Sequence, residues 1–192
     1  MNDLVQSELK KIFNGRFSTS KSTRANYARG EDTYDPILSK AVVFPETNEE
    51  VSKILSLCNE HKIPVVPFGT GTSLEGNVVG NDKGITISLE KMNKILSVNV
   101  GDFDCRVQAC VTKEQLNEYL REDGVFFPID PGADAAIGGM ASTSASGTMA
   151  VKYGTMKTVI TGLTVVLPNG DIIKTGSRTK KTSAGYNLTN LF

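Results

Sequence analysis

Pro64-Val-Val-Pro-Phe-Gly-Thr-Gly-Thr-Ser-Leu-Glu-Gly76 decides the fold, because here a short apolar strand runs directly into a glycine-rich loop. A second glycine-rich stretch is Pro131-Gly-Ala-Asp-Ala-Ala-Ile-Gly-Gly-Met-Ala-Ser-Thr-Ser-Ala-Ser-Gly147. Glycine lets a backbone adopt positive φ and approach a ligand closely. Successive backbone N–H groups in such turns bind anions without a lysine. The two loops therefore predict a diphosphate gripped from two sides, as in a nucleotide-type cofactor, and two ordinary glycine turns are the alternative.

Neither of the common phosphate-binding loops explains these glycines. The glycines at the ends of 71–76 have P-loop spacing, but Asn77 and Val78 stand where that motif needs Lys and Ser or Thr. Gly69-Thr-Gly71 begins a Rossmann-type G-x-G, but Leu74 occupies the position of its third glycine. Three neutral hydroxyls remain in the loop, on Thr70, Thr72 and Ser73. Such neutral donors suit a diphosphate that is held permanently.

Composition narrows the class of protein. The 192 residues allow one domain or two small lobes, and 21 basic residues balance 21 acidic ones. A nucleic-acid binder would show a basic stripe, so that class is not favoured. No apolar run approaches the roughly 18 residues of a membrane-spanning helix. Acidic residues as early as Asp3 and Glu8 favour a cytoplasmic protein, although the Ser-, Thr- and Arg-containing segment 16–24 leaves an organelle address open.

Apolar periodicity predicts alternating helices and strands. Two capping boxes, Thr47 with Glu50 and Thr112 with Gln115, mark helix starts. The expected helices are 3–13, 48–61, the segment after Thr112 and 139–150. The expected strands are 41–44, 64–68, 85–89, 95–100, 105–111, 125–127 and 159–167, the last with a hairpin partner at 171–175. Two β-α-β-like units, at 41–89 and 104–167, then predict an α+β fold of two lobes with the ligand between them.

The same patterns predict the organisation of the chain. Residues 1–35 read as an N-terminal helix and an irregular lead-in. Residues 36–192 read as one cofactor-binding domain with lobes at about 36–103 and 104–192. From 183 to 192 the chain becomes apolar without a following strand or helix cap, which indicates a domain truncated at its C-terminal end.

Single side chains carry smaller expectations. Glu75 and Asp134 lie inside the glycine loops, where an anion beside a diphosphate is repelled, so we expect them to face solvent or cap backbone N–H groups. The odd count of three cysteines, Cys58, Cys105 and Cys110, predicts reduced, buried thiols. The basic group Lys174, Arg178, Lys180 and Lys181 reads as a solvated loop, with a role in steering an anionic substrate as the alternative.

The two glycine stretches resemble the flavin segments of the FAD-linked oxidases of the vanillyl-alcohol oxidase type. Tyr153-Gly-Thr-Met156, Leu163-Thr-Val-Val-Leu-Pro-Asn-Gly170 and Gly185-Tyr-Asn-Leu-Thr-Asn-Leu-Phe192 continue the match in order. The resemblance covers about residues 25–192 and is greatest to the D-lactate dehydrogenase and glycolate oxidase D-subunit branch. It implies the two-lobed FAD-binding domain of that family, truncated at its C-terminal end and without the cap or substrate domain.

The resemblance also implies where FAD is held. Its pyrophosphate would be wrapped by Pro67, Phe68, Gly69, Thr70, Gly71, Thr72, Ser73 and Leu74. The ribityl chain and isoalloxazine would lie along Pro131, Gly132, Ile137, Gly138, Gly139, Ser142 and Thr143. That wall would continue through Ser146, Gly147, Tyr153 and Gly154, and the adenine would lie near Val159 and Ile160.

The chemistry implied by the family is oxidation of a small 2-hydroxy acid, D-lactate or glycolate, with hydride passing to flavin N5. Electrons would then leave to a quinone, a cytochrome or a partner flavoprotein. Some relatives tether FAD to a histidine near the first loop, where this chain has Thr72, Ser73 and Leu74, while its one histidine, His61, ends a helix. FAD is therefore expected to be non-covalent.

Catalytic residues stay unassigned at this stage. In the family, the substrate-binding arginine and a histidine-bearing metal site lie in a part that corresponds to sequence beyond Phe192, so no metal ligand is expected here and the 192-residue piece is expected to be inactive. Two other functions remain open: a flavin-binding or electron-transfer subunit without its own substrate site, and an oxidase of an alditol or sugar lactone.

Overall fold

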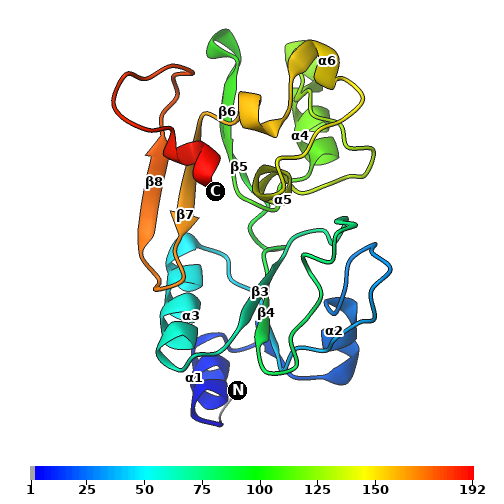
Figure 1. The fold of residues 1–192 in the computed structure, drawn as a ribbon, viewed down its shortest axis with the longest axis vertical. Coiled ribbons are helices and arrows are strands. Elements are labelled where there is room, and N and C mark those ends of the chain that lie inside the picture. Colours follow the sequence, from blue (N-terminus) through cyan, green and yellow to red (C-terminus); the bar gives the residue numbers. More distant parts are fainter. Residues whose placement is uncertain (1–2) are drawn as a thin grey trace. The chain divides into compact units, whose positions relative to one another are not determined.

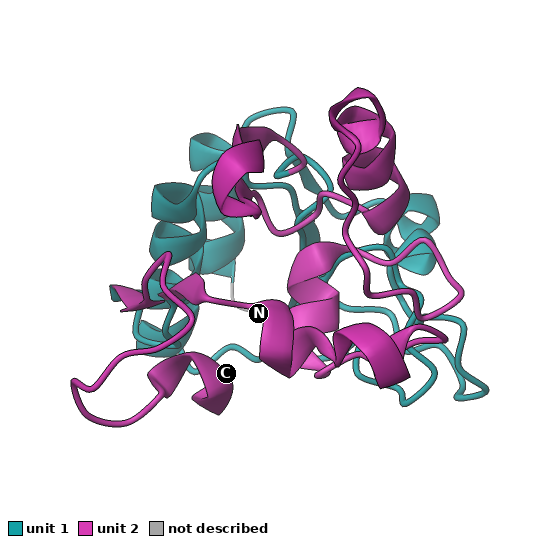
Figure 2. Cartoon of the chain, turned by 90° about the horizontal axis from the view of Figure 1, so that it is seen from above, with its two compact units in different colours: residues 1–92, 166–172 teal, residues 93–165, 173–192 magenta. Residues whose placement is uncertain are grey.

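The computed structural model describes residues 3–192 (Figure 1). The chain forms two compact units, coloured separately in Figure 2, and each has its own apolar core. The first unit contains the chain up to residue 92 together with 166–172, and the second contains 93–165 and 173–192. No helix within 3–192 combines the length and the apolar character needed to cross a bilayer.

A four-stranded sheet organises the first unit. Its strands are β1 (Phe17–Ser18), β2 (Val42–Val43), β3 (Val65–Phe68) and β4 (Ile85–Ser88), in the spatial order β1-β2-β4-β3. β2 and β3 both run parallel to β4, whereas β1 pairs antiparallel with β2. All four residues of β4 are buried, as expected for a central parallel strand.

Three helices accompany this sheet: α1 (Asp3–Ile12), α2 (Lys21–Asn26) and α3 (Asn48–Glu60). α1 forms where the sequence predicts a helix, because Val5 and Leu9 lie one turn apart and are fully buried. They join side chains of α3 and of β2 and β4 in one apolar core. Its buried members are Val5, Leu9, Phe13, Ala41, Val43, Ile54, Cys58, Ile85 and Ile87.

Only half of the capping box predicted at the start of α3 forms. The Thr47 hydroxyl accepts a hydrogen bond from the Glu50 N–H at 3.2 Å. The Glu50 carboxylate accepts two 2.6 Å hydrogen bonds from the Arg16 guanidinium and a 2.7 Å bond from the Glu46 N–H. The Arg16 hydrogen bond lowers the pKa of Glu50. In a capping box the Glu50 carboxylate would bond the backbone at the start of α3. Here it links α3 to Arg16, in the segment before β1.

The turn at 167–171 also packs on α3. The Ser52 hydroxyl donates to the Gly170 carbonyl at 2.5 Å, and the Ser56 hydroxyl donates to the Asn169 carbonyl at 3.0 Å. A Cβ on Gly170 would lie 1.9 Å from the Ser56 oxygen, so glycine is needed for this approach. A segment late in the sequence thus completes the first unit.

The second unit contains two short antiparallel sheets and several short helices. Its strands are β5 (Ile95–Asn99), β6 (Asp104–Val107), β7 (Gly162–Val166) and β8 (Ile172–Gly176), paired β5-β6 and β7-β8. Its helices are η1 (Val100–Asp102), α4 (Lys113–Leu120), η2 (Arg121–Asp123), α5 (Ile137–Ser142), α6 (Ala150–Tyr153), α7 (Met156–Val159) and η3 (Leu188–Leu191). The buried core beneath them is Val111, Leu116, Leu120, Ile129, Ala135, Ile137, Met140 and Met156.

The strand predicted at 125–127 is wrong. The Asn117 side chain on α4 forms both hydrogen bonds of the Phe127 backbone. Its amide oxygen accepts from the Phe127 N–H at 2.7 Å, and its amide nitrogen donates to the Phe127 carbonyl at 3.2 Å. Since a side chain satisfies the groups that a neighbouring strand would use, the second predicted β-α-β unit does not form.

Three boundaries in the second unit also differ from the prediction. The strand predicted at 105–111 ends at Val107. The helix predicted at 139–150 is the shorter α5, and the chain turns at Ser144, whose φ is 49°. The strand predicted at 159–167 starts at Gly162, because α7 forms a helical turn before it. Cys58 and Cys110 are buried as predicted, whereas Cys105 is exposed on the β5-β6 hairpin.

Candidate functional site

The first glycine loop follows β3 and is shaped by the glycine at its centre. Gly71 has a φ of 75°, and a Cβ there would lie 2.7 Å from the Phe68 ring. Both observations require glycine. Other residues rarely adopt positive φ, and there is no room for a Cβ beside the Phe68 ring. The Phe68 ring is itself fixed by an edge-on contact with Tyr27, with centroids 5.1 Å apart.

Four consecutive backbone N–H groups in this loop are unpaired within the described residues. The backbone N–H groups from Gly71 to Leu74 donate to no acceptor anywhere in residues 3–192. The Ser73 hydroxyl accepts instead from the Glu75 N–H at 3.5 Å and donates to the Asn77 side-chain oxygen at 2.7 Å. A run of unpaired N–H groups forms a concavity that binds anions, and a diphosphate fits this donor set.

A segment from earlier in the chain braces the loop. The Glu31 N–H donates to the Gly71 carbonyl at 2.9 Å, and the Gly80 N–H donates to the Ala28 carbonyl at 2.9 Å. A Cβ on Gly30 would lie 2.5 Å from the Gly71 carbonyl oxygen and 2.9 Å from that of Ser73. The sequence predicts only an irregular lead-in here, and the contact of this segment with the loop is not evident from it.

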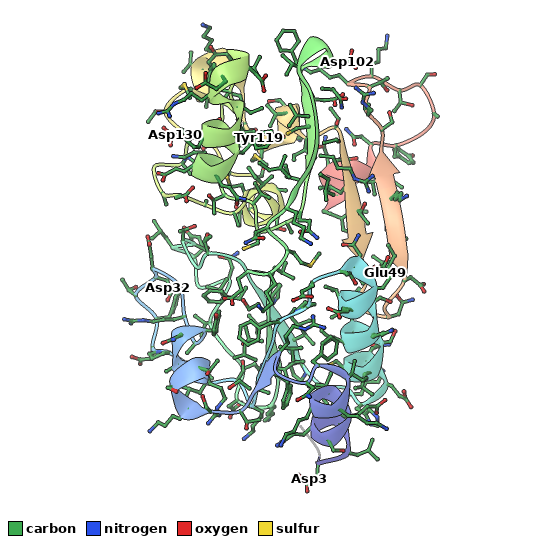
Figure 3. All side chains as sticks on the ribbon, turned by 180° about the vertical axis from the view of Figure 1, so that it is seen from behind. Asp3, Asp32, Glu49, Asp102, Tyr119 and Asp130 are labelled. Atoms are coloured by element: carbon green, nitrogen blue, oxygen red, sulfur yellow. The ribbon has the colours of Figure 1, made fainter. Side chains whose placement is uncertain are left out.

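Asp32 holds the bracing segment in shape. Its carboxylate accepts hydrogen bonds from the Gly30 N–H at 3.1 Å and from the Tyr34 N–H at 3.0 Å. The residue is 7% exposed. Figure 3 labels Asp32 on the loop that follows α2.

The second glycine loop is closed on itself at its two ends. The Asp130 carboxylate, labelled in Figure 3, accepts from the Lys113 ammonium at 3.0 Å and from the Gly132 N–H at 3.1 Å. The Lys113 hydrogen bond is the main cause of the lowered pKa of Asp130. The Asp130 carbonyl accepts from the Thr148 N–H at 3.2 Å, and a Cβ on Gly147 would lie 1.8 Å from that carbonyl oxygen.

Helix α5 occupies the middle of this second loop. The Gly138 N–H donates to the Ala109 carbonyl at 2.8 Å, and a Cβ on Gly138 would lie 2.7 Å from that of Ala109. The Ser142 and Thr143 hydroxyls each donate to a carbonyl of the preceding helical turn at 3.0 Å. Gly139 faces open space, with no atom within 4 Å of an added Cβ. The helix therefore presents small groups whose hydrogen bonds are largely satisfied.

The remaining predicted site residues pack within the second unit. The Tyr153 ring meets Phe126 edge-on at 5.5 Å, and the Lys152 ammonium lies 4.9 Å from the Tyr153 centroid. Val159 and Ile160 are half-buried against the second core. Ser146 is exposed, and Gly154 has a φ of 82°. The structure thus groups 67–74 in the first unit and the predicted residues from 131 to 160 in the second.

The acidic residues of the loops behave as the sequence predicts. Glu75 is exposed, and the Asp134 carboxylate accepts from the Glu114 N–H at 2.8 Å, at the start of α4. Arg178 from the basic group donates to Asp102 at 2.5 Å and to Asp104 at 2.8 Å, which raises its pKa. Its charge is therefore offset within the same unit. In the described part of the chain, no three His, Cys, Asp or Glu side chains gather as a metal site.

Comparison with known proteins identifies the family. The family described as FAD binding domain matches residues 39–176. The chain belongs to this family. Among solved structures, an alkyldihydroxyacetonephosphate synthase matches all of the chain and 37% of its own length, at a TM-score of 0.86 and 21% identity. That likeness shows the fold, and together with the family match it confirms the predicted α+β FAD-binding architecture.

Curated relatives place the chain in the branch that the sequence resembles. "Probable D-lactate dehydrogenase, mitochondrial" of Danio rerio is 47% identical over 91% of this chain. "D-lactate dehydrogenase [cytochrome], mitochondrial" of Arabidopsis thaliana is 44% identical over 96% of it. "Glycolate oxidase subunit GlcD" of Bacillus subtilis is 35% identical over 92% of it. The chain spans 36%, 33% and 38% of these relatives, about a third of their length.

Proposed function

We propose that this chain is the FAD-binding part of an enzyme that oxidises a small 2-hydroxy acid of the D-lactate or glycolate type. Membership of the FAD-binding family supports the cofactor, and the names of the relatives support the substrate class. FAD, when bound, supplies a hydride acceptor at flavin N5 for the α-hydrogen of the acid. The residues of this chain bind and orient that cofactor.

The single observation that carries the proposal is the run of open amides from Gly71 to Leu74. In our proposal these N–H groups, with the hydroxyls of Thr70 and Thr72, bind the two phosphates of FAD within the stretch 67–74. Backbone donors bind the anion in a fixed geometry and need no reorganisation, because the loop is already braced.

The second loop has a different proposed role. Pro131, Gly132 and the face of α5 would lie along the ribityl chain and the isoalloxazine ring. The open space at Gly139 and the hydroxyls of Ser142 and Thr143, already bonded to the helix, leave a surface of small groups that suits a flat ring. Ser146, Gly147, Tyr153 and Gly154 would extend this wall, and Val159 and Ile160 would approach the adenine.

We also propose that FAD is held without a covalent bond. The first loop offers Thr72, Ser73 and Leu74, none of which is the histidine that such a tether uses, and His61 is the C-cap residue of α3. Acid precipitation of the flavin-loaded protein should release all of the yellow colour into the supernatant. Colour that stays with the denatured chain would contradict this proposal.

The electron acceptor and the cellular location of the protein are two further parts of the proposal. A quinone, a cytochrome or a partner flavoprotein would accept the electrons, and the name of the Arabidopsis relative favours a cytochrome. We propose a cytoplasmic location, whereas the names of the zebrafish and Arabidopsis relatives give mitochondria for those proteins. Cell fractionation followed by detection of the protein decides between the two compartments.

The decisive experiment uses protein expressed from the complete reading frame. Its flavin absorbance in the blue should bleach on addition of D-lactate or glycolate without oxygen, and it should not bleach with L-lactate. Bound flavin that no hydroxy acid bleaches would overturn the enzyme proposal and favour the second candidate, a flavin-carrying subunit. The word "subunit" in the name of the Bacillus relative is the observation that favours this candidate. The 192-residue chain alone is expected to oxidise neither acid.

A further inference from the structure

We propose that Asp32 is a positioning residue for the diphosphate-binding loop and acts through the backbone of Gly30 and Glu31. The inference rests on the proposed role of residues 67–74 in binding FAD. Asp32 does not belong to the loop, and its side chain is occupied by backbone donors of its own segment.

The carboxylate fixes the segment on both of its sides. One oxygen accepts from the Gly30 N–H, two residues before it, and the other accepts from the Tyr34 N–H, two residues after it. With the residue only 7% exposed, water cannot easily replace either partner. Residues 30–34 are therefore held as one compact turn around a single side chain.

This turn sets the direction of an open amide in the loop. The Glu31 N–H binds the Gly71 carbonyl oxygen at 2.9 Å. In a planar trans peptide the carbonyl and the next N–H point in opposite directions, so fixing the Gly71 carbonyl also fixes the Thr72 N–H. That N–H is one of the four without an acceptor in residues 3–192. Asp32 thus determines where one proposed phosphate donor points, although it does not touch the ligand.

Close packing makes the coupling stiff. There is no room for a Cβ at Gly30, because the carbonyl oxygens of Gly71 and Ser73 would lie 2.5 and 2.9 Å from it. At the other end of the turn, a Cβ on Gly76 would lie 2.8 Å from the Tyr34 ring. A shift of the turn therefore moves the loop at two points.

Geometry, and not charge, accounts for this role. A carboxylate near a diphosphate is electrostatically unfavourable, so its benefit must come from the two hydrogen bonds it accepts. Asp32→Asn removes the charge but keeps one acceptor oxygen. Asp32→Ala removes both acceptors. The proposal therefore predicts a graded loss, with Ala affected more than Asn.

The test measures FAD and ADP affinity in protein from the complete reading frame, by equilibrium dialysis of the FAD-free form. Asp32→Ala should weaken binding of both probes about 10- to 100-fold, the range expected when hydrogen bonds to a charged acceptor are lost. Asp32→Asn should weaken it less. Gly30→Ala, which leaves the carboxylate intact but presses on the same carbonyls, should act like Asp32→Ala. Asp35→Ala and Gly101→Ala are the matched controls, because Asp35 is exposed and Gly101 has open space around it.

Two further readouts separate positioning from general stability. The visible circular dichroism of bound flavin should change in Asp32→Ala and Gly30→Ala, and the double variant should bind FAD no more weakly than the worse single variant. If Asp32→Ala does not fold, Asp32→Asn and Gly30→Ala decide. Wild-type protein that binds neither FAD nor ADP would overturn the proposed function itself. Wild-type binding that the Asp32 and Gly30 variants retain at the level of the controls would overturn this inference alone, even if their unfolding temperatures fall.

Discussion

The two glycine-rich loops have similar composition but opposite use of their backbone. In the first, the amides from Gly71 to Leu74 have no acceptor in the described residues, and another segment braces the loop from behind. In the second, the ends close through Asp130, and the helix α5 uses most of its own donors. The first loop therefore leaves backbone donors unpaired, whereas the second leaves a surface of small groups.

The glycines also serve different physical needs. Gly71 needs a positive φ, whereas Gly138 and Gly147 have ordinary φ values and are required because another backbone passes too close for a Cβ. Gly139 has neither need, since its φ is ordinary and the space beside it is open. A glycine count alone cannot separate these cases, but substitution by alanine can.

The largest effect is expected from Gly147→Ala. Its new Cβ would meet the Asp130 carbonyl oxygen at 1.8 Å, and backbone cannot yield as a flexible side chain can. The free energy of unfolding should fall by about 3 kcal/mol, at the upper end for an overpacked site. Urea denaturation of the FAD-free protein measures it, with Gly101→Ala as the control. Equal stability of the two variants would show that the second loop does not depend on this closure.

Gly71→Ala should cost about 1–3 kcal/mol, the range for a residue held at an unfavourable backbone angle. Asn tolerates the left-handed region better than Ala, so Gly71→Asn should lose less. Both variants add the same Cβ beside the Phe68 ring, so the difference between them isolates the backbone angle. Identical unfolding midpoints for the Ala and Asn variants would contradict this reason for the glycine.

Gly139→Ala sharpens the comparison by changing stability and affinity in opposite directions. The FAD-free protein should gain about 0.5–1 kcal/mol, because alanine replaces glycine within a helix. Affinity for FAD should fall, because the added methyl group would occupy the surface proposed for the ring. Unfolding curves and FAD titration measure the two quantities. A variant that is more stable and binds FAD unchanged would remove α5 from the proposed site.

The smallest effect concerns acid. The Lys113 hydrogen bond lowers the pKa of Asp130 from its usual 3.8. The ionised carboxylate therefore stabilises the folded protein at any pH above the pKa that Asp130 has in the unfolded chain. This stabilisation is lost as the pH falls through the lower pKa of the folded state. Lys113→Met should raise the pKa of Asp130, measured by the carboxyl carbon shift in NMR. Lys157→Met, at an exposed lysine that no ion pair with Asp130 involves, should leave it unchanged. An unaltered Asp130 titration in Lys113→Met would mean that the second loop is closed by backbone contacts alone.

Local signals in the sequence were sufficient for much of the fold. Thr47 and Thr112 start their helices as predicted, because an N-cap acts within one turn. The hydrogen bonds of the third helical residues, Glu50 and Gln115, were not predictable, because their partners lie far away in the sequence. The Glu50 carboxylate binds Arg16, 34 residues earlier, and the Gln115 side chain donates to the Asn93 carbonyl. The strand expected at 125–127 failed for the same reason, as a side chain from α4 satisfied its backbone.

The site shows the same limit. Glycine density located both loops, but it gave no indication of which amides would stay open or what would support them. The turn at 30–34 was missed because its hydrogen bond to the loop joins backbone atoms, the Glu31 N–H and the Gly71 carbonyl. An aspartate side chain commonly accepts a hydrogen bond from the backbone N–H two residues after it, so Asp32 in a polar, turn-rich stretch could have directed attention to this segment.

The turn at 167–171 has a consequence for how the protein is made. Ser52 and Ser56 find their carbonyl partners 118 and 113 residues later in the chain. The ribosome must therefore synthesise the chain beyond residue 170 before the first unit can form its last contacts. Until then, Ser52 and Ser56 on α3 lack these carbonyl partners. Contacts of such long sequence separation slow folding. Nascent chains stalled before residue 166 should accordingly be more sensitive to protease at α3 than chains released after the complete reading frame.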